Sequence, residues 1–322
     1  MFQKITFAAS LLCLALSAQA QNADDFPKKP IKFVTLTSAG TAGDVMARFL
    51  AEKMGPLLGT SVYVDFRGGA AGQIASNIVA KSPADGYTIL LGGASSHILL
   101  PALKEKMPYD SLKDFTYLGQ IATAPVTLLA TKDFPANNLE ELIALARKSP
   151  QMQYVSWGIG SSGHLCGELL NQRKNLQMEH IPFTTGIMSA LYGGQIQLAW
   201  QDGGTAVGMV QSGKVKAIAV CTSKHARLPE VQSYEELNIA DASKSIGQFR
   251  WAVYAPAGLP TPVRKKLENA LQQSLAKDDV RQRIIDLGYD PQFIPGDTVK
   301  GMTQFEIGEW RKIGQTAGIK LE

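Results

Sequence analysis

The feature that most constrains the fold of this chain is a strand, loop and helix unit that occurs four times. In each unit an apolar run with strand character ends in a loop rich in Gly, Ser or Thr, and residues with helical spacing follow. Short links between alternating strands and helices are typical of α/β folds, with parallel strands and right-handed crossovers. The four loops are Ser38–Gly43, Gly68–Gly72, Gly92–Ser96 and Gly158–Gly163.

Loops of this kind can hold an anion, because they place backbone N–H groups and hydroxyls at the positive end of a helix. The first loop is the strongest candidate, with hydroxyls on Thr37, Ser38 and Thr41 and glycines that permit close backbone approach. Asp44 follows in the first helical turn, where we expect it to order the loop from beneath. The alternative interpretation is that these loops are Gly-rich only because the turns are tight.

No obvious nucleophile, general base or metal-ligand cluster accompanies these loops in the sequence. The histidines lack the spacing of metal ligands, although His97 and His164 stand just past a glycine loop, where a ligand could touch them. The segment around Ser162 fails the nucleophile pattern G-x-S-x-G, because His164 occupies its last position. We therefore predict a protein that captures an anion without transforming it, with no cofactor and no metal.

The segment Gly158–Gly163 offers a competing hypothesis, because it matches the dinucleotide pattern G-x-G-x-x-G between a strand and a helix. Its position in mid-chain and the two hydroxyls of Ser161 and Ser162 are atypical of that motif. An exported protein would also have little access to a nicotinamide pool. A dinucleotide-dependent oxidoreductase therefore stays as the minor alternative.

The first 20 residues resemble an export signal, with Lys4, an apolar stretch over Ile5–Leu16 and a small-residue cleavage motif at Ala18–Ala20. The apolar stretch is short for a membrane span, so we expect a soluble periplasmic protein after cleavage. The remaining length normally forms two domains. A net charge of +4 gives no support to a nucleic-acid partner.

Two cysteines, Cys166 and Cys221, remain beyond the predicted signal. An exported protein could join them in a disulfide, but sequence alone cannot place them within bonding distance. Each lies in an apolar run, so we favour two buried free thiols.

Apolar periodicity predicts alternating strands and helices along the chain, without tandem repeats. The two strands at 115–121 and 126–131 are expected where the chain passes from one lobe to the other. The other predicted strands are 31–35, 61–64, 87–91, 153–157, 179–182, 198–200, 216–220 and 249–254, and the predicted helices include 139–147, 164–171, 262–275, 280–287 and 298–317.

Two tryptophans, Trp157 and Trp200, each end a predicted strand. In an open α/β sheet that edge faces the ligand crevice, so the pair is expected to form a wall against a flat ligand. Gln201 and Asp202 follow and could exchange hydrogen bonds with that ligand. The alternative interpretation is that both tryptophans belong to the core.

Several stretches together resemble the periplasmic solute receptors of tripartite tricarboxylate transporters, known as Bug-type receptors. The resemblance runs from Pro30 to Lys320 and is more specific than any single glycine motif. The stretches that carry it are Pro30–Lys32, Asp44–Arg48, Ala80–Thr88, Met107–Asp110, Lys113–Phe115, Gly160–Ser161 with His164–Leu165, and Tyr254–Gly258.

The resemblance implies a type II-like, two-lobed binding protein that closes on an organic carboxylate and delivers it to membrane transporter subunits. Each lobe is expected to be a mainly parallel sheet flanked by helices, with lobe 1 over 27–122 and 248–322 and lobe 2 over 123–247. A monomer is expected. The ligand-binding residues expected from the loops and the resemblance are Thr37, Ser38, Ala39, Gly40, Thr41, Gln73, Ser96, His97, Trp157, Gly160, Ser161, Ser162, His164, Trp200 and Asp202.

This chain departs from the family pattern mainly in the predicted cleft loops. Trp157 stands where a small residue is usual, Gln73 replaces a common Asn, and Trp200–Asp202 replaces Phe-Asp-Asn. We therefore expect an aromatic mono- or dicarboxylate, such as a benzoate- or terephthalate-like acid. A sensory adaptor that presents its ligand to a signalling protein is a further alternative.

Overall fold

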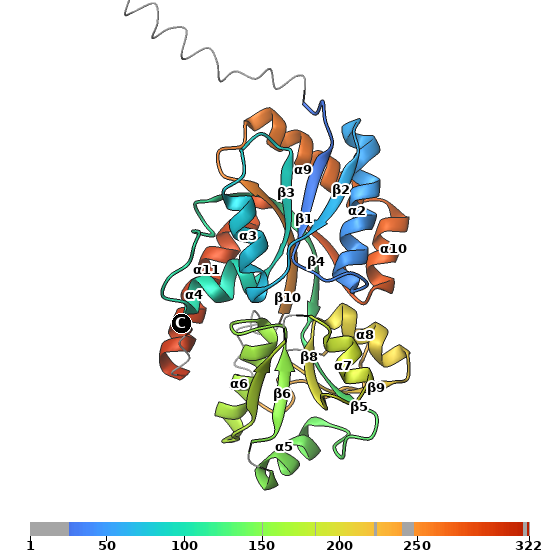
Figure 1. The fold of residues 1–322 in the computed structure, drawn as a ribbon, viewed down its shortest axis with the longest axis vertical. Coiled ribbons are helices and arrows are strands. Elements are labelled where there is room, and N and C mark those ends of the chain that lie inside the picture. The colour runs from blue at the N-terminus through green and yellow to red at the C-terminus, as the bar shows by residue number, and fades with distance from the viewer. Residues whose placement is uncertain are drawn as a thin grey trace, which may run out of the picture.

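The computed structural model describes residues 26–149, 151–183, 185–221, 224–239, 248–317 and 321. The predicted export signal, residues 1–20, lies outside the described residues. The described chain forms two lobes, each built around one sheet with helices packed on it (Figure 1). This confirms the predicted two-lobed α/β architecture.

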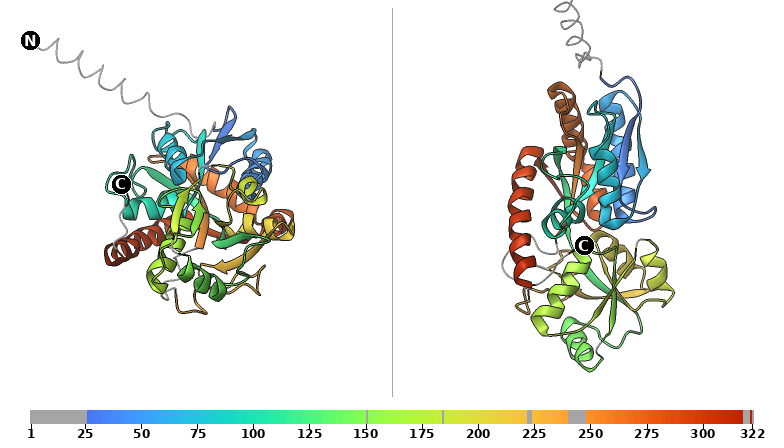
Figure 2. Two further views of the ribbon diagram at one scale, coloured as in Figure 1. Left: turned by 60° about the horizontal axis from the view of Figure 1, so that its bottom comes forward. Right: turned by 60° about the vertical axis from the view of Figure 1, so that its left-hand side comes forward.

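The first lobe contains a six-stranded sheet in the order β11-β4-β10-β3-β1-β2. Helices α2, α3, α4, α9, α10 and α11 surround it (Figure 1). Figure 2 shows the long helix α11 along one side of the molecule. The strands are β1 (Ile31–Thr35), β2 (Val62–Phe66), β3 (Thr88–Gly93), β4 (Phe115–Pro125), β10 (Gln248–Pro256) and β11 (Asp290–Pro295). The helices are α2 (Ala42–Leu58), η3 (Ala70–Gly72), α3 (Gln73–Ala80), η4 (Ser95–Leu99), α4 (Leu100–Leu103), α9 (Thr261–Leu275), α10 (Asp278–Asp286) and α11 (Gly296–Ala317).

The second lobe contains a five-stranded sheet in the order β7-β6-β8-β5-β9. Its strands are β5 (Thr127–Thr131), β6 (Gln153–Ser156), β7 (Glu179–Pro182), β8 (Leu198–Gln201) and β9 (Val215–Val220). Its helices are α5 (Leu139–Lys148), α6 (Ser162–Lys174), α7 (Ile187–Tyr192) and α8 (Gly203–Gln211).

Both sheets are mixed, with a parallel part and an antiparallel part. Strand β1 pairs in parallel with β2 and β3, and β6 pairs in parallel with β7 and β8. Strands β4, β10 and β11 pair antiparallel in the first sheet, and β5 does so in the second. The expected parallel pairing therefore holds for the strand–loop–helix units, while the strands near the crossing between the lobes form the antiparallel part of each sheet.

The chain crosses from the first sheet to the second at Val126, between β4 and β5. Strand β4 continues through Pro125 because it pairs with β10 along its whole length. We therefore propose that lobe 1 includes residues 123–125 and that lobe 2 begins at Val126.

Side-chain caps explain where three of the helices begin. Thr41 accepts a hydrogen bond from the N–H of Asp44 at the start of α2, and Ser161 accepts one from His164 at the start of α6. Asp202 does the same for Thr205 at the start of α8. Such caps satisfy N–H groups that have no partner within the helix. They also fix the three loops that face the junction between the lobes.

The prediction of free thiols at Cys166 and Cys221 is wrong, because the two form a disulfide with Cα atoms 5.8 Å apart. Cys166 lies on α6 and Cys221 just beyond β9, so the bond ties a helix to the sheet beneath it. Both residues are fully buried, which is why each sits in an apolar run. A buried cysteine can be a free thiol or part of a disulfide, so burial alone does not distinguish the two. The apolar periodicity of the sequence does not show which helix packs on which strand.

Candidate ligand-binding site

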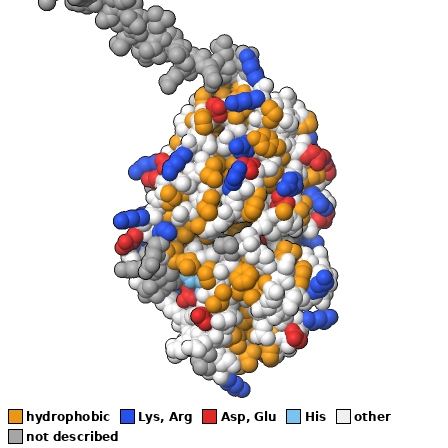
Figure 3. Space-filling model, viewed as in Figure 1, with side chains coloured by type: hydrophobic (Ala, Val, Ile, Leu, Met, Phe, Trp, Pro, Cys, Tyr) orange, Lys and Arg blue, Asp and Glu red, His pale blue; other side chains and the backbone are white. Residues whose placement is uncertain are grey.

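A cavity of about 360 Å³ lies between the two lobes. Hydrophobic side chains appear on both sides of the junction between the lobes on the face shown in Figure 3. Both lobes line the cavity. Lobe 1 contributes Leu36, Thr37, Ser38, Ala39, Gly40, Thr41, Gly69, Ala71, Gly72, Phe249 and Trp251. Lobe 2 contributes Trp157, Thr185, Gly186, Ile187, Met188, Ser189, Tyr192, Gln201 and Asp202.

The loop between β1 and α2 forms the polar floor of the cavity. Gly40 adopts a left-handed conformation at φ +81°, and its N–H donates to Oδ2 of Asp44 over 3.2 Å. Asp44 is 4% exposed and also pairs with Arg48 at 3.0 Å, so it holds the loop from below as predicted. The first N–H groups of α2 have no partners within the helix, and the helix dipole favours an anion at this end.

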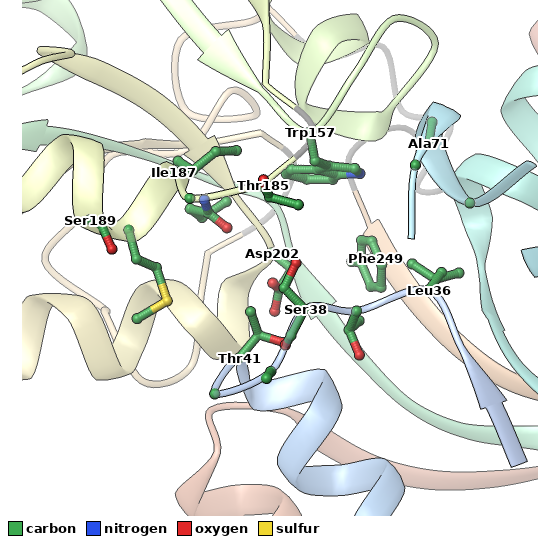
Figure 4. A pocket seen from close by; sticks show the side chains of 18 of the residues that line it. Leu36, Ser38, Thr41, Ala71, Trp157, Thr185, Ile187, Ser189, Asp202 and Phe249 are labelled. Atoms are coloured by element: carbon green, nitrogen blue, oxygen red, sulfur yellow. The ribbon is translucent and has the colours of Figure 1, made fainter. Parts of the chain in front are cut away.

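The apolar wall of the cavity consists of three aromatic rings from both lobes. The rings of Trp157 and Phe249 pack edge-on with their centroids 5.9 Å apart. The ring centroids of Phe249 and Trp251 are 4.6 Å apart. Phe249 and Trp251 lie two residues apart on β10, so their side chains point to the same face of the sheet. Figure 4 shows Trp157 and Phe249 on one side of the cavity and Ser38 and Thr41 on another. Such a surface suits a flat, apolar ligand body.

Asp202 carries the only formal charge among the described residues that line the cavity. It follows β8 and caps α8, with its Oδ1 atom accepting a hydrogen bond from the N–H of Thr205 at 3.0 Å. The hydroxyl of Tyr289, which lies in lobe 1 just before β11, donates to the same oxygen. Burial raises the pKa of Tyr289 well above its usual range, and the Asp202 charge adds to that shift.

The structure brings seven of the fifteen predicted site residues together at the cavity. These are Thr37, Ser38, Ala39, Gly40, Thr41, Trp157 and Asp202. The other eight do not line it, namely Gln73, Ser96, His97, Gly160, Ser161, Ser162, His164 and Trp200.

The loop Gly158–Gly163 lies at the contact between the lobes instead of on the cavity wall. The N–H of Ser162 donates to Oγ of Ser95 in lobe 1 at 3.3 Å, and Ser161 is fully buried beneath it. An added Cβ at Gly160 would lie 2.5 Å from the Leu100 side chain of lobe 1. Residues of lobe 1 therefore occupy the space beside this loop that the pyrophosphate of a dinucleotide would need.

His164 binds its own loop, since Nδ1 accepts a hydrogen bond from the N–H of Gly160 at 3.1 Å. Its ring stacks on His180 at 4.1 Å. Burial lowers the pKa of His164 to about 4. Burial also lowers the pKa of His180, to about 3, and the neighbouring His164 contributes to that shift. Both rings are therefore neutral at pH 7 and offer no positive charge to an anionic ligand.

The remaining predicted residues lie in or near the core. His97 is fully buried and stacks on Tyr254 at 3.8 Å, and burial lowers its pKa to about 3. Ser96 donates to the carbonyl of Gly93 beside it. Trp200 is fully buried against Tyr234, because side chains alternate along β8 and Gln201 takes the cavity side. Gln73 is half-buried at the start of α3.

Residue-level reasoning missed the contribution of helix α7 and the β10 side of the wall. The lining residues from Thr185 to Tyr192 lie just before α7 and along it, and the apolar pattern did not predict this helix. The i, i+2 pair Phe249 and Trp251 was a usable signal, since both lie on one face of a predicted strand.

Among the described residues, no group of three or more His, Cys, Asp or Glu side chains could hold a metal ion. None of the described helices has the length and apolar character needed to cross a membrane.

Comparison with known families gives one match that covers most of the chain. A family model described as "Tripartite tricarboxylate transporter family receptor" matches residues 46–319. Among solved structures, the periplasmic binding protein BugD is similar to the chain, with a TM-score of 0.85 and 30% identity. That similarity covers 92% of this chain and 100% of BugD.

Two similar solved structures contain a named ligand. MatC from Rhodopseudomonas palustris with bound malate has a TM-score of 0.81 and 28% identity, over 89% of this chain and 99% of MatC. A second R. palustris protein, solved with adipate, has a TM-score of 0.83 and 28% identity, over 92% of this chain and 99% of its own.

Proposed function

The chain belongs to the family of tripartite tricarboxylate transporter receptors, which are periplasmic solute-binding proteins, and on that premise we propose its ligand and its role. We propose that it captures an organic carboxylate with an aromatic body, a mono- or dicarboxylate of benzoate or terephthalate type. It then delivers this ligand, as a monomer, to the membrane subunits of a transporter.

The observation that carries the proposal is the pairing of an aromatic wall with a loop floor at the N-terminus of α2. Trp157, Phe249 and Trp251 line one part of the cavity, while Thr37–Thr41 of the loop before α2 line another. Burying an aromatic ring against this wall contributes on the order of 2 kcal/mol. The N–H groups and hydroxyls would orient the carboxylate through charge-assisted hydrogen bonds.

The related structures support a carboxylate as the chemical class of the ligand. Malate and adipate, the ligands in the two R. palustris structures, are both aliphatic dicarboxylates. The three rings of the cavity wall favour a flatter and more apolar body than either. The aromatic part of the proposal therefore rests on the cavity wall and not on the relatives.

Delivery requires that the transporter distinguish the loaded protein from the empty one. A ligand that contacts both lobes stabilises the closed arrangement, because it gains those contacts only when the lobes meet. The cavity lining comes from both lobes, which fits such closure. The closed form is the species that we propose to dock on the membrane subunits.

Isothermal titration of the purified protein tests the proposal with benzoate, terephthalate, adipate and, as a neutral control, glucose. We expect both aromatic acids to bind more tightly than adipate. Phe249→Leu removes one ring of the wall, so it should weaken benzoate binding about threefold to tenfold and leave adipate binding nearly unchanged. Phe305→Leu is the matched control, because Phe305 is 68% exposed on α11.

Binding of adipate alone would contradict the aromatic part of the proposal. Binding of glucose with no binding of any acid would contradict the carboxylate class altogether.

A further inference from the structure

The cavity contains a negative charge and no positive one among its described lining residues. Asp202 supplies that charge, and no Lys, Arg or His side chain lines the described cavity to offset it. A ligand that carried only carboxylates would therefore meet a like charge at this point. Figure 4 labels Asp202 among the side chains that line the cavity, together with Ser38 and Thr41.

The position of the Asp202 carboxylate is fixed by two donors on one of its oxygens. The N–H of Thr205 and the hydroxyl of Tyr289 both donate to Oδ1. These contacts come from different lobes, since Thr205 lies on α8 and Tyr289 lies between α10 and β11. Among the described residues, no hydrogen bond or ion pair reaches Oδ2. That oxygen is left as an acceptor at a cavity wall.

From this geometry we infer that Asp202 selects carboxylate ligands that also carry a hydrogen-bond donor, a hydroxyl or an amine, placed to meet its Oδ2 atom. The inference rests on the proposed function and narrows it. A donor on the ligand turns the like-charge contact into a charge-assisted hydrogen bond. A second carboxylate at the same place would instead leave two anions facing each other in a partly buried site.

The consequence is an order of preference among otherwise similar acids. A hydroxybenzoate or aminobenzoate should bind more tightly than benzoate, and benzoate more tightly than terephthalate. The same rule applies to an aliphatic pair, because malate is succinate with one added hydroxyl. The pair therefore tests Asp202 even where the aromatic wall is not used.

Titration calorimetry tests the inference with benzoate, terephthalate, the three hydroxybenzoate isomers, the three aminobenzoate isomers, malate and succinate. In the unmodified protein we expect at least one donor-bearing benzoate to bind tenfold or more tightly than benzoate. Comparing the hydroxyl and amine series shows which donor the site takes. Malate should likewise bind more tightly than succinate.

The decisive variant is Asp202→Asn, because an amide oxygen can still accept from Thr205 and Tyr289 while the charge is lost. We expect the preference for donor-bearing acids to fall below threefold and the affinity for terephthalate to rise. Asp202→Ser keeps a helix cap without the amide and serves as the second variant if the first is unstable. Gln201→Glu is the opposite control, since it adds a negative charge at a neighbouring cavity residue and should weaken every acid.

The outcomes separate this inference from the proposed function. Equal binding of acids with and without donors, or an unchanged preference in Asp202→Asn, would overturn the inference alone. Binding of aliphatic acids only would overturn the aromatic proposal, while the ratio of malate to succinate would still decide the role of Asp202. Absence of binding by every acid would overturn both.

Discussion

At the scale of single residues, the floor of the cavity depends on a glycine, where a side chain would not fit. Gly43 sits at the start of α2, where a Cβ would lie 2.7 Å from the Thr37 methyl group and 2.7 Å from the Trp251 ring. The missing side chain lets the loop pack directly against the aromatic wall. The two surfaces that we assign to the carboxylate and to the ring therefore meet at this glycine.

Gly43→Ala is expected to push the loop and the Trp251 ring apart and to weaken binding of the preferred acid by tenfold or more. Urea unfolding should show a loss of stability of about 1 to 3 kcal/mol, as is typical of overpacking. Gly208→Ala is the matched control on α8, since its added Cβ meets no atom within 4 Å. That control should leave binding unchanged, and unaltered affinity in Gly43→Ala would contradict the proposed floor.

The histidines give the protein a predictable dependence on pH. Burial lowers the pKa of His97 and His180 to about 3 and that of His164 to about 4, against about 6.5 in the unfolded chain. Below pH 6.5 the unfolded chain binds protons that the native protein does not, so stability falls as the pH decreases toward 4. For the fully buried His97 the loss is up to about 1.4 kcal/mol per pH unit.

Urea unfolding at pH 7.5, 6.0 and 5.0 measures this effect. The variant His97→Gln should show a shallower decline than the unmodified protein, because one titrating group is gone. A free energy of unfolding that stays constant from pH 7.5 to 5.0 would contradict the neutral, buried state of these rings.

At the scale of elements, the sequence pattern predicted most strands and helices but not all of their partners. Apolar alternation and helix caps act locally, so β6 and α6 appear close to where the pattern placed them. Strand β11 was missed because its residues, Asp290–Pro295, include two prolines and only two apolar side chains besides them. Its pairing with β4 comes from tertiary packing and leaves little trace in the sequence.

The disulfide is the clearest case of a non-local feature that the pattern could not predict. The bond between Cys166 and Cys221 closes a loop over a sequence separation of 55 residues. Cross-linking a loop of that length should stabilise the protein by about 4 kcal/mol through the unfolded state. The double variant Cys166→Ala with Cys221→Ala is therefore expected to unfold at clearly lower urea concentration.

Ligand binding should survive this change, since neither cysteine lines the cavity. Addition of a reductant should lower the stability of the unmodified protein and have no effect on the double variant. Equal stability of the two proteins under non-reducing conditions would contradict the disulfide.

At the scale of the whole molecule, the lobes meet along two different surfaces, and only one of them encloses the cavity. The loop before α2 faces the cavity, whereas Gly158–Gly163 packs against Ser95 and Leu100 of the opposite lobe. The two loops have similar composition, so the sequence could not separate these roles. Their difference arises from how the lobes are placed relative to each other, which no local pattern encodes.

The central claim is that the cavity between the lobes holds a carboxylate ligand with an aromatic body. The most direct measurement is a crystal structure of the protein with the tightest-binding aromatic acid. We expect the ring beside Trp157 and Phe249, and the carboxylate within hydrogen-bond distance of N–H or hydroxyl groups of Ser38–Thr41. A ligand bound outside this cavity, or a ring turned away from both aromatic side chains, would contradict the claim.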